Sequence, residues 1–363
     1  MCPIKISVFC LATFCILNFD ISNADVHLDD WDHDHHHTSP EHWDKACKDG
    51  EKQSPIDIIS NKAIKHHWGQ PFVFHGYEQS VPMQVKNNRH SLVVEFSNDD
   101  HEDVWINGGG LGESKFQFSQ LHFHWGSTND QGSEHTIDGK SYPMEMHIVH
   151  WNLDVGKDPN SATKKDAYNS LEVLSVLFEV GEKNEKYDSF FNAAKDVSME
   201  NSTSTIENGL KLKDLLPEDT NSFYRYRGSL TTPPCNEIVM WTVFQEHINV
   251  SQSQLDIIRK VTYNRKGENE PRDISNNYRL PQKLNERNVT LVDTHIVHAK
   301  NCNFVSEDKN ESDRASVISI TVVVQLVVIG CIYLIIQRFN CRERLQKEEP
   351  KRNEPETEKI ICA

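Results

Sequence analysis

Polar and apolar residues alternate strictly along Gln120–Gly126, and this pattern predicts a β-strand. Side chains alternate between the two faces of a strand, so His122 and His124 project from the same side. The other face carries a row of apolar side chains that we expect to point into the core: Leu121, Phe123 and Trp125. An isolated His-x-His pair is more often solvent-facing or hydrogen-bonded than metal-bound, so the pair alone does not predict a metal site.

Residues 145–152 show the same alternation and predict a second strand. Glu145, His147 and Val149 share one of its faces, which makes His147 the best candidate for a third imidazole. Further short apolar runs bounded by polar turns predict strands at Leu92–Phe96 and Leu174–Phe178.

Helical periodicity is sparse in this sequence. Ser251–Lys260 predicts one short helix, with Ser251 as its N-cap and with Leu255 and Ile258 three residues apart. Gly108–Gly112 superficially resembles a phosphate-binding loop, but it lacks the Gly-Lys-Ser/Thr ending and a following helix, so it predicts a turn between strands. The predicted fold class is therefore predominantly β (α+β). Residues 25–300 contain no linker and no internal repeat, so we expect one domain there.

Two apolar runs flank this block. Residues 1–24 combine Lys5, an apolar stretch and the small-residue site Ser22-Asn23-Ala24. They predict a cleaved signal peptide in preference to a membrane anchor, because the apolar run is short for a span. Residues 315–336 carry no charge and predict a transmembrane helix, and the basic residues that follow predict a cytoplasmic C-terminus.

The chain is thus expected to be a single-pass type I protein of the plasma membrane with its main domain outside the cell. The expected segments are a signal peptide (1–24), a catalytic domain (25–300), an extracellular stalk (301–314), a transmembrane helix (315–336) and a cytoplasmic tail (337–363).

The formal net charge of −16 over 363 residues argues against a nucleic-acid-binding protein, which would show a basic patch. The segment Asp32–His37 is rich in histidine and could bind stray metal, but a solvated N-terminal segment is the simpler interpretation.

Nine cysteines are distributed among these segments. The extracellular part keeps Cys47, Cys235 and Cys302, an odd number in an oxidising compartment, so one pair and one remaining thiol are the simplest outcome. Cys341, beside the predicted span, could be palmitoylated, although an idle thiol is the simpler interpretation. Four glycosylation sequons all lie between the signal and the span, at Asn201, Asn249, Asn288 and Asn310.

Several other fragments accompany the two histidine-bearing strands. They occur in the order Pro40–Trp43, Gln53–Ile58, Asn87–His90, Gly132–Thr136 and Ser229–Cys235. As an ordered set, from about Trp31 to Val297, they closely resemble the α-class carbonic anhydrases, and the flanking segments resemble the membrane-anchored extracellular members. The resemblance implies a large, mostly antiparallel twisted sheet with short surface helices. It also implies zinc-hydroxide-catalysed, reversible hydration of carbon dioxide to bicarbonate and a proton at the cell surface.

By this resemblance, His122, His124 and His147 are the ligands of a catalytic Zn²⁺. Three neutral imidazoles leave the fourth tetrahedral position open for water, which distinguishes a catalytic from a structural zinc. Gln120 and Glu145 each stand two residues before a ligand on the same strand face, where each is suited to accept an N–H from the ligand's ring.

The resemblance also assigns the residues around the reacting atoms. Thr231 matches the residue that accepts the hydroxide proton and passes its own hydrogen bond to Glu134. Carbon dioxide carries no charge, so its place should be an apolar wall. The matching pocket positions are Val149, Val173, Leu230 and Trp241, and Thr232 matches a residue that helps to hold bicarbonate.

His90 matches the family's proton shuttle, and a relay for this chemistry needs a pKa near 7, which histidine supplies. The sequence departs from the family at His33, where a tyrosine is usual, and at Val93, where many relatives carry a polar residue. Both departures concern the efficiency of the proton relay. The late Arg-Pro pattern of the family appears as Arg279-Leu280-Pro281.

Cys47 and Cys235 match the disulfide of secreted and membrane-bound relatives, which would anchor the segment that carries Thr231. An alternative function is a binding or adhesion module, since the fold also occurs in inactive extracellular domains. Those domains typically lose a zinc histidine, and all three are present here, so the enzyme is favoured. The bilayer is the expected partner of the predicted helix. A second copy of the chain, through Ala315 and Ser319, and a bicarbonate transporter remain open as partners.

Overall fold

The structure is a computed structural model that describes residues 43, 45–66, 69–98, 103–264 and 270–295. These residues all belong to one compact unit, Met1–Val297. No helix among them is long and apolar enough to cross a membrane. The predicted signal peptide, stalk, transmembrane helix and cytoplasmic tail lie outside the described residues.

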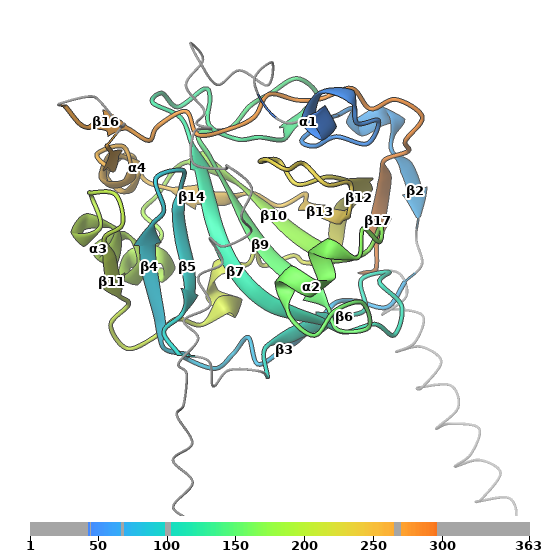
Figure 1. The fold of residues 1–363 in the computed structure, drawn as a ribbon, viewed down its shortest axis with the longest axis horizontal. Helices are drawn as coiled ribbons and strands as arrows, with labels where there is room; N and C mark the ends of the chain where they lie inside the picture. The colour runs from blue at the N-terminus through green and yellow to red at the C-terminus, as the bar shows by residue number, and fades with distance from the viewer. Residues whose placement is uncertain (1–42, 44, 67–68, 99–102, 265–269, 296–363) are drawn as a thin grey trace, which may run out of the picture. The chain divides into compact units, whose positions relative to one another are not determined.

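A sheet of 13 strands dominates the described part of the chain (Figure 1). Its main path runs through β11 (Thr203–Thr205), β4 (Met83–Asn87), β5 (Leu92–Phe96), β7 (Phe116–Trp125), β9 (Met144–Asn152), β10 (Leu171–Val180), β13 (Val239–Phe244), β12 (Ser222–Gly228), β17 (Thr290–Asp293) and β2 (Ile64–His66). Off this path lie β14 (Ile248–Val250), β3 (Val73–His75) and β6 (Trp105–Asn107). Two small sheets pair β1 (Asp57–Ile58) with β8 (Thr136–Ile137) and β15 (Thr262–Tyr263) with β16 (Arg272–Asp273).

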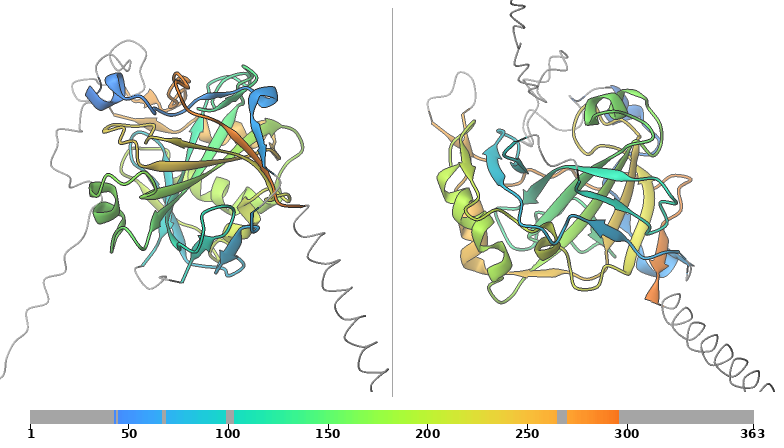
Figure 2. Two further views of the ribbon diagram at one scale, coloured as in Figure 1. Left: turned by 90° about the vertical axis from the view of Figure 1, so that its right-hand side faces the viewer. Right: turned by 90° about the horizontal axis from the view of Figure 1, so that it is seen from below.

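The large sheet is mixed. Strand β10 is parallel to both β13 and β14, and β17 is parallel to β2, whereas the other pairs in this sheet are antiparallel. The predominantly β class is thus as predicted, but the sheet also contains parallel pairs. The strands fan out with a strong twist, as the views in Figures 1 and 2 show.

Alternation along the central strands gives the sheet two differently packed faces. On β7, Leu121, Phe123 and Trp125 are fully buried in the larger hydrophobic cluster, as the pattern predicts. On β10, Val173 and Leu177 belong to a second cluster, which also contains Trp241 of β13. The period of two therefore separates one face that builds the main core from another that carries the histidines and a smaller apolar patch.

Helices are few and short in the described part of the chain. They are α1 (Lys45–Asp49), α2 (Pro159–Lys164), α3 (Asp188–Asp196) and α4 (Gln252–Ile258), with 3-10 turns η1 (Ser60–Lys62), η2 (Glu185–Tyr187) and η3 (Leu212–Leu215). The predicted helix at Ser251–Lys260 corresponds to α4, and the Ser251 side chain caps it by accepting from the Gln254 N–H. Helices α3 and α4 pack together, and α3 contacts β4 and β11 (Figure 1). The glycine-rich segment at 108–112 forms the predicted turn between β6 and β7.

Candidate active site

The two histidine-bearing strands, β7 and β9, are neighbours in the sheet. Their register places His122 directly opposite His147, so the two rings project from the same face of adjacent strands. His124 is two residues further along β7, on that same face. The strand pairing therefore brings together three imidazoles that are contributed by only two segments.

One ring nitrogen from each of His122, His124 and His147 lies within 4.8 Å of the other two. The ring centroids are 4.7–5.2 Å apart. Burial lowers the pKa of all three imidazoles, that of His124 to about 4, so they are neutral near pH 7 and keep a lone pair for a metal.

Each of these three rings has its other nitrogen fixed by an acceptor. His122 Nδ1 is 3.0 Å from Gln120 Oε1, and His147 Nε2 is 2.6 Å from Glu145 Oε1. His124 Nδ1 is 2.6 Å from the backbone carbonyl oxygen of Asn277. An acceptor on one ring nitrogen places the proton there and leaves the lone pair on the other nitrogen, as in metal-bound histidines. The residues present therefore fit a three-histidine zinc site.

Glu145 is the centre of a buried hydrogen-bond cluster. Its Oε1 accepts from His147, from His135 Nδ1 at 2.6 Å and from Ser175 Oγ at 2.7 Å. Its Oε2 accepts from the backbone N–H groups of Glu134 and His135, both at 2.8 Å. Burial acts to raise the pKa of Glu145, but electrostatic interactions and hydrogen bonds with the rings of His135 and His147 lower it well below the usual value. Because both rings point N–H groups at the same oxygen, His135, Glu145 and His147 form a hydrogen-bond network and not a second metal site.

Glu134 lies beside the nitrogens that face away from these acceptors. Its Oε2 is 3.5 Å from His124 Nε2 and 3.9 Å from His147 Nδ1. Its Oε1 accepts from the backbone N–H of Arg279 at 2.8 Å. Burial raises the pKa of Glu134 to about 7, while the Thr231 hydroxyl acts in the opposite direction as a hydrogen-bond donor. Thr231 itself is buried.

An apolar wall stands next to the histidines. Val149, Val173 and Trp241 are consecutive cross-strand neighbours on β9, β10 and β13. The Trp241 ring is 4.7 Å from the His147 ring, and its Nε1 donates to the Ser229 carbonyl oxygen at 3.1 Å. Leu230 packs against the same hydrophobic cluster. Val149, Val173 and Trp241 therefore form one surface beside His147, and Leu230 packs against the cluster that contains Val173 and Trp241.

His90 lies in the turn between β4 and β5, and Val93 of β5 is directly opposite His122. Burial, followed by the positive charge of Arg89, lowers the pKa of His90 to about 3. At pH 7 the His90 ring is therefore neutral, and it accepts a proton less readily than a relay with a pKa near 7. His33 lies outside the described residues.

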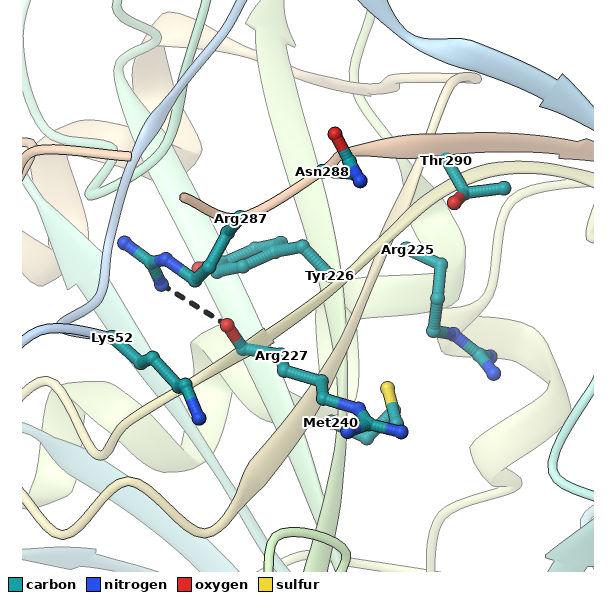
Figure 3. A pocket seen from close by; sticks show the side chains of 8 residues that line it. All are labelled: Lys52, Arg225, Tyr226, Arg227, Met240, Arg287, Asn288 and Thr290. Atoms are coloured by element: carbon teal, nitrogen blue, oxygen red, sulfur yellow. Dashed lines mark hydrogen bonds between the residues drawn. The ribbon is translucent and has the colours of Figure 1, made fainter. Parts of the chain in front are cut away.

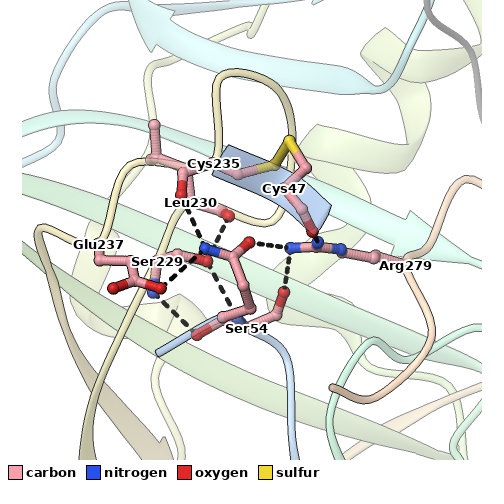
Figure 4. Close-up of a disulfide and its surroundings, with 8 residues drawn as sticks. Cys47, Ser54, Ser229, Leu230, Cys235, Glu237 and Arg279 are labelled. Carbon is pink, nitrogen blue, oxygen red and sulfur yellow. Dashed lines mark hydrogen bonds between the residues drawn. A yellow bond between two sulfur atoms is a disulfide. The ribbon is translucent and has the colours of Figure 1, made fainter. Parts of the chain in front are cut away.

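The disulfide Cys47–Cys235 joins α1 to the loop that carries Thr231 (Figure 4). The buried Arg279 side chain is hydrogen-bonded to the backbone of this bridge: its Nη2 donates to the Cys47 carbonyl oxygen at 2.7 Å. Since the Arg279 backbone N–H also bonds Glu134, one residue connects the bridge to the carboxylate beside the histidines.

Several residues of the site have no role in the interpretation of the sequence. Asn277 holds His124 through its backbone, and its side chain accepts from the Trp125 N–H at 2.8 Å. His135 bonds both Glu145 and, through Nε2 at 2.6 Å, the Tyr226 hydroxyl. A backbone carbonyl has no signature in sequence, whereas His135 stands next to Glu134 and could have been noticed as a second buried imidazole.

The predicted glycosylation sites are compatible with the surface. Asn201, Asn249 and Asn288 are exposed, and Asn310 lies outside the described residues. Thr232 is half-buried in the loop that precedes Cys235.

Comparison with known proteins agrees with this geometry. The family model for eukaryotic-type carbonic anhydrase matches residues 38–293. The chain is 35% identical over 304 residues to carbonic anhydrase 12 of Homo sapiens, which covers 82% of this chain and 79% of that protein. It is 38% identical over 258 residues to carbonic anhydrase 4 of Rattus norvegicus, which covers 70% of this chain and 79% of the relative.

The chain therefore belongs to the eukaryotic-type carbonic anhydrase family. It is a carbonic anhydrase that catalyses the reversible hydration of carbon dioxide to bicarbonate and a proton, and its cofactor is zinc.

Proposed function

We propose that this reaction is carried out at the three-histidine cluster, with His122, His124 and His147 as the zinc ligands. The observation that carries the proposal is the matched set of acceptors: Gln120, Glu145 and the Asn277 carbonyl each fix one ring nitrogen. Zinc, when bound there, supplies a Lewis acid that makes a water molecule nucleophilic near neutral pH. The remaining chemistry belongs to residues of the chain.

Thr231 and Glu134 orient the nucleophile in this proposal. The Glu134 carboxylate is fixed by the Arg279 N–H, lies beside His124 and accepts a hydrogen bond from the Thr231 hydroxyl. A hydroxyl that donates in this direction can only accept from the nucleophile, so a lone pair of the nucleophile is turned toward the substrate carbon. This is orientation catalysis and needs no net charge transfer through Thr231.

The apolar wall of Val149, Val173, Leu230 and Trp241 holds carbon dioxide. Cross-strand pairing fixes the positions of Val149, Val173 and Trp241 relative to His147. An apolar surface is the appropriate partner for a substrate without charge, and the product anion is retained more weakly on such a surface. Thr232, half-buried at the edge of the loop, is proposed to help hold bicarbonate.

His90, which is half-buried in the turn between β4 and β5, is proposed as the proton relay. A pKa of about 3 in the described position makes proton acceptance unfavourable, although still less so than direct transfer to bulk water. Exposure would remove the burial that is the main cause of this low pKa.

We further propose that the catalytic domain (25–300) is extracellular and is tethered by a transmembrane helix at 315–336 to a cytoplasmic tail. The apolar pattern, the basic flank and the disulfide all support this topology. Glycosylation at Asn201, Asn249, Asn288 and Asn310, a homodimer and contact with a bicarbonate transporter belong to the same proposal.

Metal removal and reconstitution test the site. Dialysis of the enzyme against a chelator should abolish carbon dioxide hydration, and one equivalent of Zn²⁺ should restore it. A Gln120→Ala variant should require more zinc for half-restoration, about 10–100-fold by comparison with other second-layer partners of metal ligands. A chelated enzyme that retained full activity would contradict the proposal.

A further inference from the structure

A polar pocket, distinct from the histidine site, lies at the edge of strand β12, where β17 ceases to pair with it. Strand β17 pairs with Ser222–Arg225 only, so residues 226–228 of β12 run past its end. Arg287 reaches across this gap and donates from Nη1 to the Arg227 carbonyl oxygen at 3.0 Å. The pocket between them has a volume of about 310 Å³. Its lining is Lys52, Arg225, Tyr226, Arg227, Met240, Arg287, Asn288 and Thr290 (Figure 3).

This pocket is strongly basic within a chain of net charge −16. Four of its eight lining residues are basic and none of these eight is acidic. Two carboxylates lie close behind it. Glu172 is 3.4 Å from Arg225 Nη2, and Glu237 accepts the Lys52 backbone N–H. The four lining cations therefore outnumber these two carboxylates.

The cations differ in how far their donors are already used. Arg287 is anchored, with donors bound to carbonyl oxygens of Gln53, Lys283, Leu284 and Arg227. In contrast, the Lys52 ammonium and the Arg227 guanidinium form no hydrogen bond or ion pair with any described residue, and both extend downward in the view of Figure 3. Arg227 is held in place by stacking 4.0 Å over the exposed Tyr168 ring. An ordered guanidinium with all its donors available suits an oxyanion, which it can bind through two parallel hydrogen bonds.

We propose that this pocket is a binding site for a sulfate or phosphate group, separate from the zinc centre. The cross-strand register supports the separation, because the side chains of Arg225, Arg227 and Met240 lie on the opposite face of the sheet from Trp241 of the apolar wall. Lys52 and Arg227 bind the oxyanion directly, while Arg287 and Arg225 contribute positive charge. The same group chemistry can come from a free ion or from a sulfated polysaccharide.

Binding measurements on the full-length, deglycosylated enzyme test this site, because a glycan on Asn288 would stand at its rim. The probes are sodium sulfate, sodium phosphate and a heparin oligosaccharide, each at constant ionic strength, with calorimetry as the readout. The test variant is Lys52→Gln with Arg227→Gln. The matched control is Lys211→Gln with Lys260→Gln, which removes the same charge from exposed positions outside the pocket.

The test variant should lose about tenfold or more in affinity, as expected for the loss of charge-assisted hydrogen bonds, while the control and the carbon dioxide hydration rate stay unchanged. Loss of inorganic sulfate or phosphate binding assigns the site to free ions. Loss of heparin binding alone assigns it to a sulfated polysaccharide. Equal affinity of the test variant and the wild type, or an equal loss in the control, would overturn the proposal.

Discussion

Glu145 Oε1 accepts a hydrogen bond from His147 Nε2 at 2.6 Å, and the same oxygen accepts from His135 Nδ1 at the same distance. One fully buried carboxylate therefore fixes His147, a proposed zinc ligand, and a second imidazole together. Because this carboxylate stays ionised, it also strengthens His147 as a ligand by increasing the basicity of its ring.

Glu145→Gln should weaken zinc binding by about 10–100-fold, because the neutral amide is a poorer acceptor for both rings. Competition for zinc with a chelator measures this affinity. Glu179→Gln is the control, since Glu179 is a half-exposed carboxylate of the neighbouring strand β10 that binds Lys140 and His247. Unchanged zinc affinity in Glu145→Gln would show that Glu145 does not contribute to zinc binding.

Glu172 should make folding stability depend on pH. Burial raises its pKa to about 7, against the opposing effects of Arg225 and of the Thr242 hydroxyl. Because the folded pKa lies above the usual 4.5, the carboxyl contributes its full stabilisation only below about pH 4.5, and this contribution is lost as the pH rises through 7. When urea unfolding is measured from pH 4.5 to 8, the free energy of unfolding should fall more steeply with pH in wild type than in Glu172→Gln. An equal change in unfolding free energy with pH in both proteins would be inconsistent with a raised pKa of Glu172.

Reduction of the Cys47–Cys235 disulfide should lower both the melting temperature and the turnover. The bridge joins residues 188 positions apart, and its removal costs up to about 5 kcal/mol in the chain-entropy model. Turnover should fall because Arg279 binds the Cys47 carbonyl and the Glu134 carboxylate at once. A Cys47→Ser, Cys235→Ser variant should have the melting temperature and turnover of the reduced enzyme, and reductant should change neither. If reductant left both quantities of the wild type unchanged, the bridge would have no role in the site.

His90→Ala should lower kcat for carbon dioxide hydration and leave kcat/KM nearly unchanged, because proton removal follows the substrate step. Added imidazole buffer should restore part of the lost turnover. Arg89 precedes His90 and makes a smaller contribution than burial to its low pKa, so Arg89→Gln should leave turnover unchanged or raise it slightly. Absence of rescue by imidazole would assign the relay to another group.

Local patterns in the sequence were sufficient to predict β5, β7, β9, α4 and the 108–112 turn, because each has a clear period or cap. Helix α3 was missed. Its N-cap, Tyr187, makes no side-chain capping bond, so the usual signal for a helix start is missing. Its buried residues Phe190, Phe191, Ala193 and Ala194 nevertheless share one helix face. The parallel pairs of β10 could not be predicted either, because pairing between distant segments is set by tertiary packing and not by local propensity.

The candidate site divides in the same way. Strand alternation, which is a local rule, predicts that His122 and His124 share one face and that His147 shares a face with Glu145. The assignment of the three histidines as zinc ligands came from the family resemblance. The acceptor for His124 is a carbonyl 153 residues away, which no side-chain pattern records. The low pKa of His90 depends on its burial, which only the three-dimensional arrangement reveals.

Stopped-flow carbon dioxide hydration by wild type and His122→Ala, with zinc content measured on the same samples, tests the three-histidine zinc site most directly. His75→Ala is the control, since His75 is an exposed histidine of β3 that contacts Trp105 outside the site. Wild type and the control should contain about one zinc per chain and be fully active, whereas His122→Ala should lose both zinc and hydration. Retained hydration by a His122→Ala enzyme without zinc would contradict this prediction.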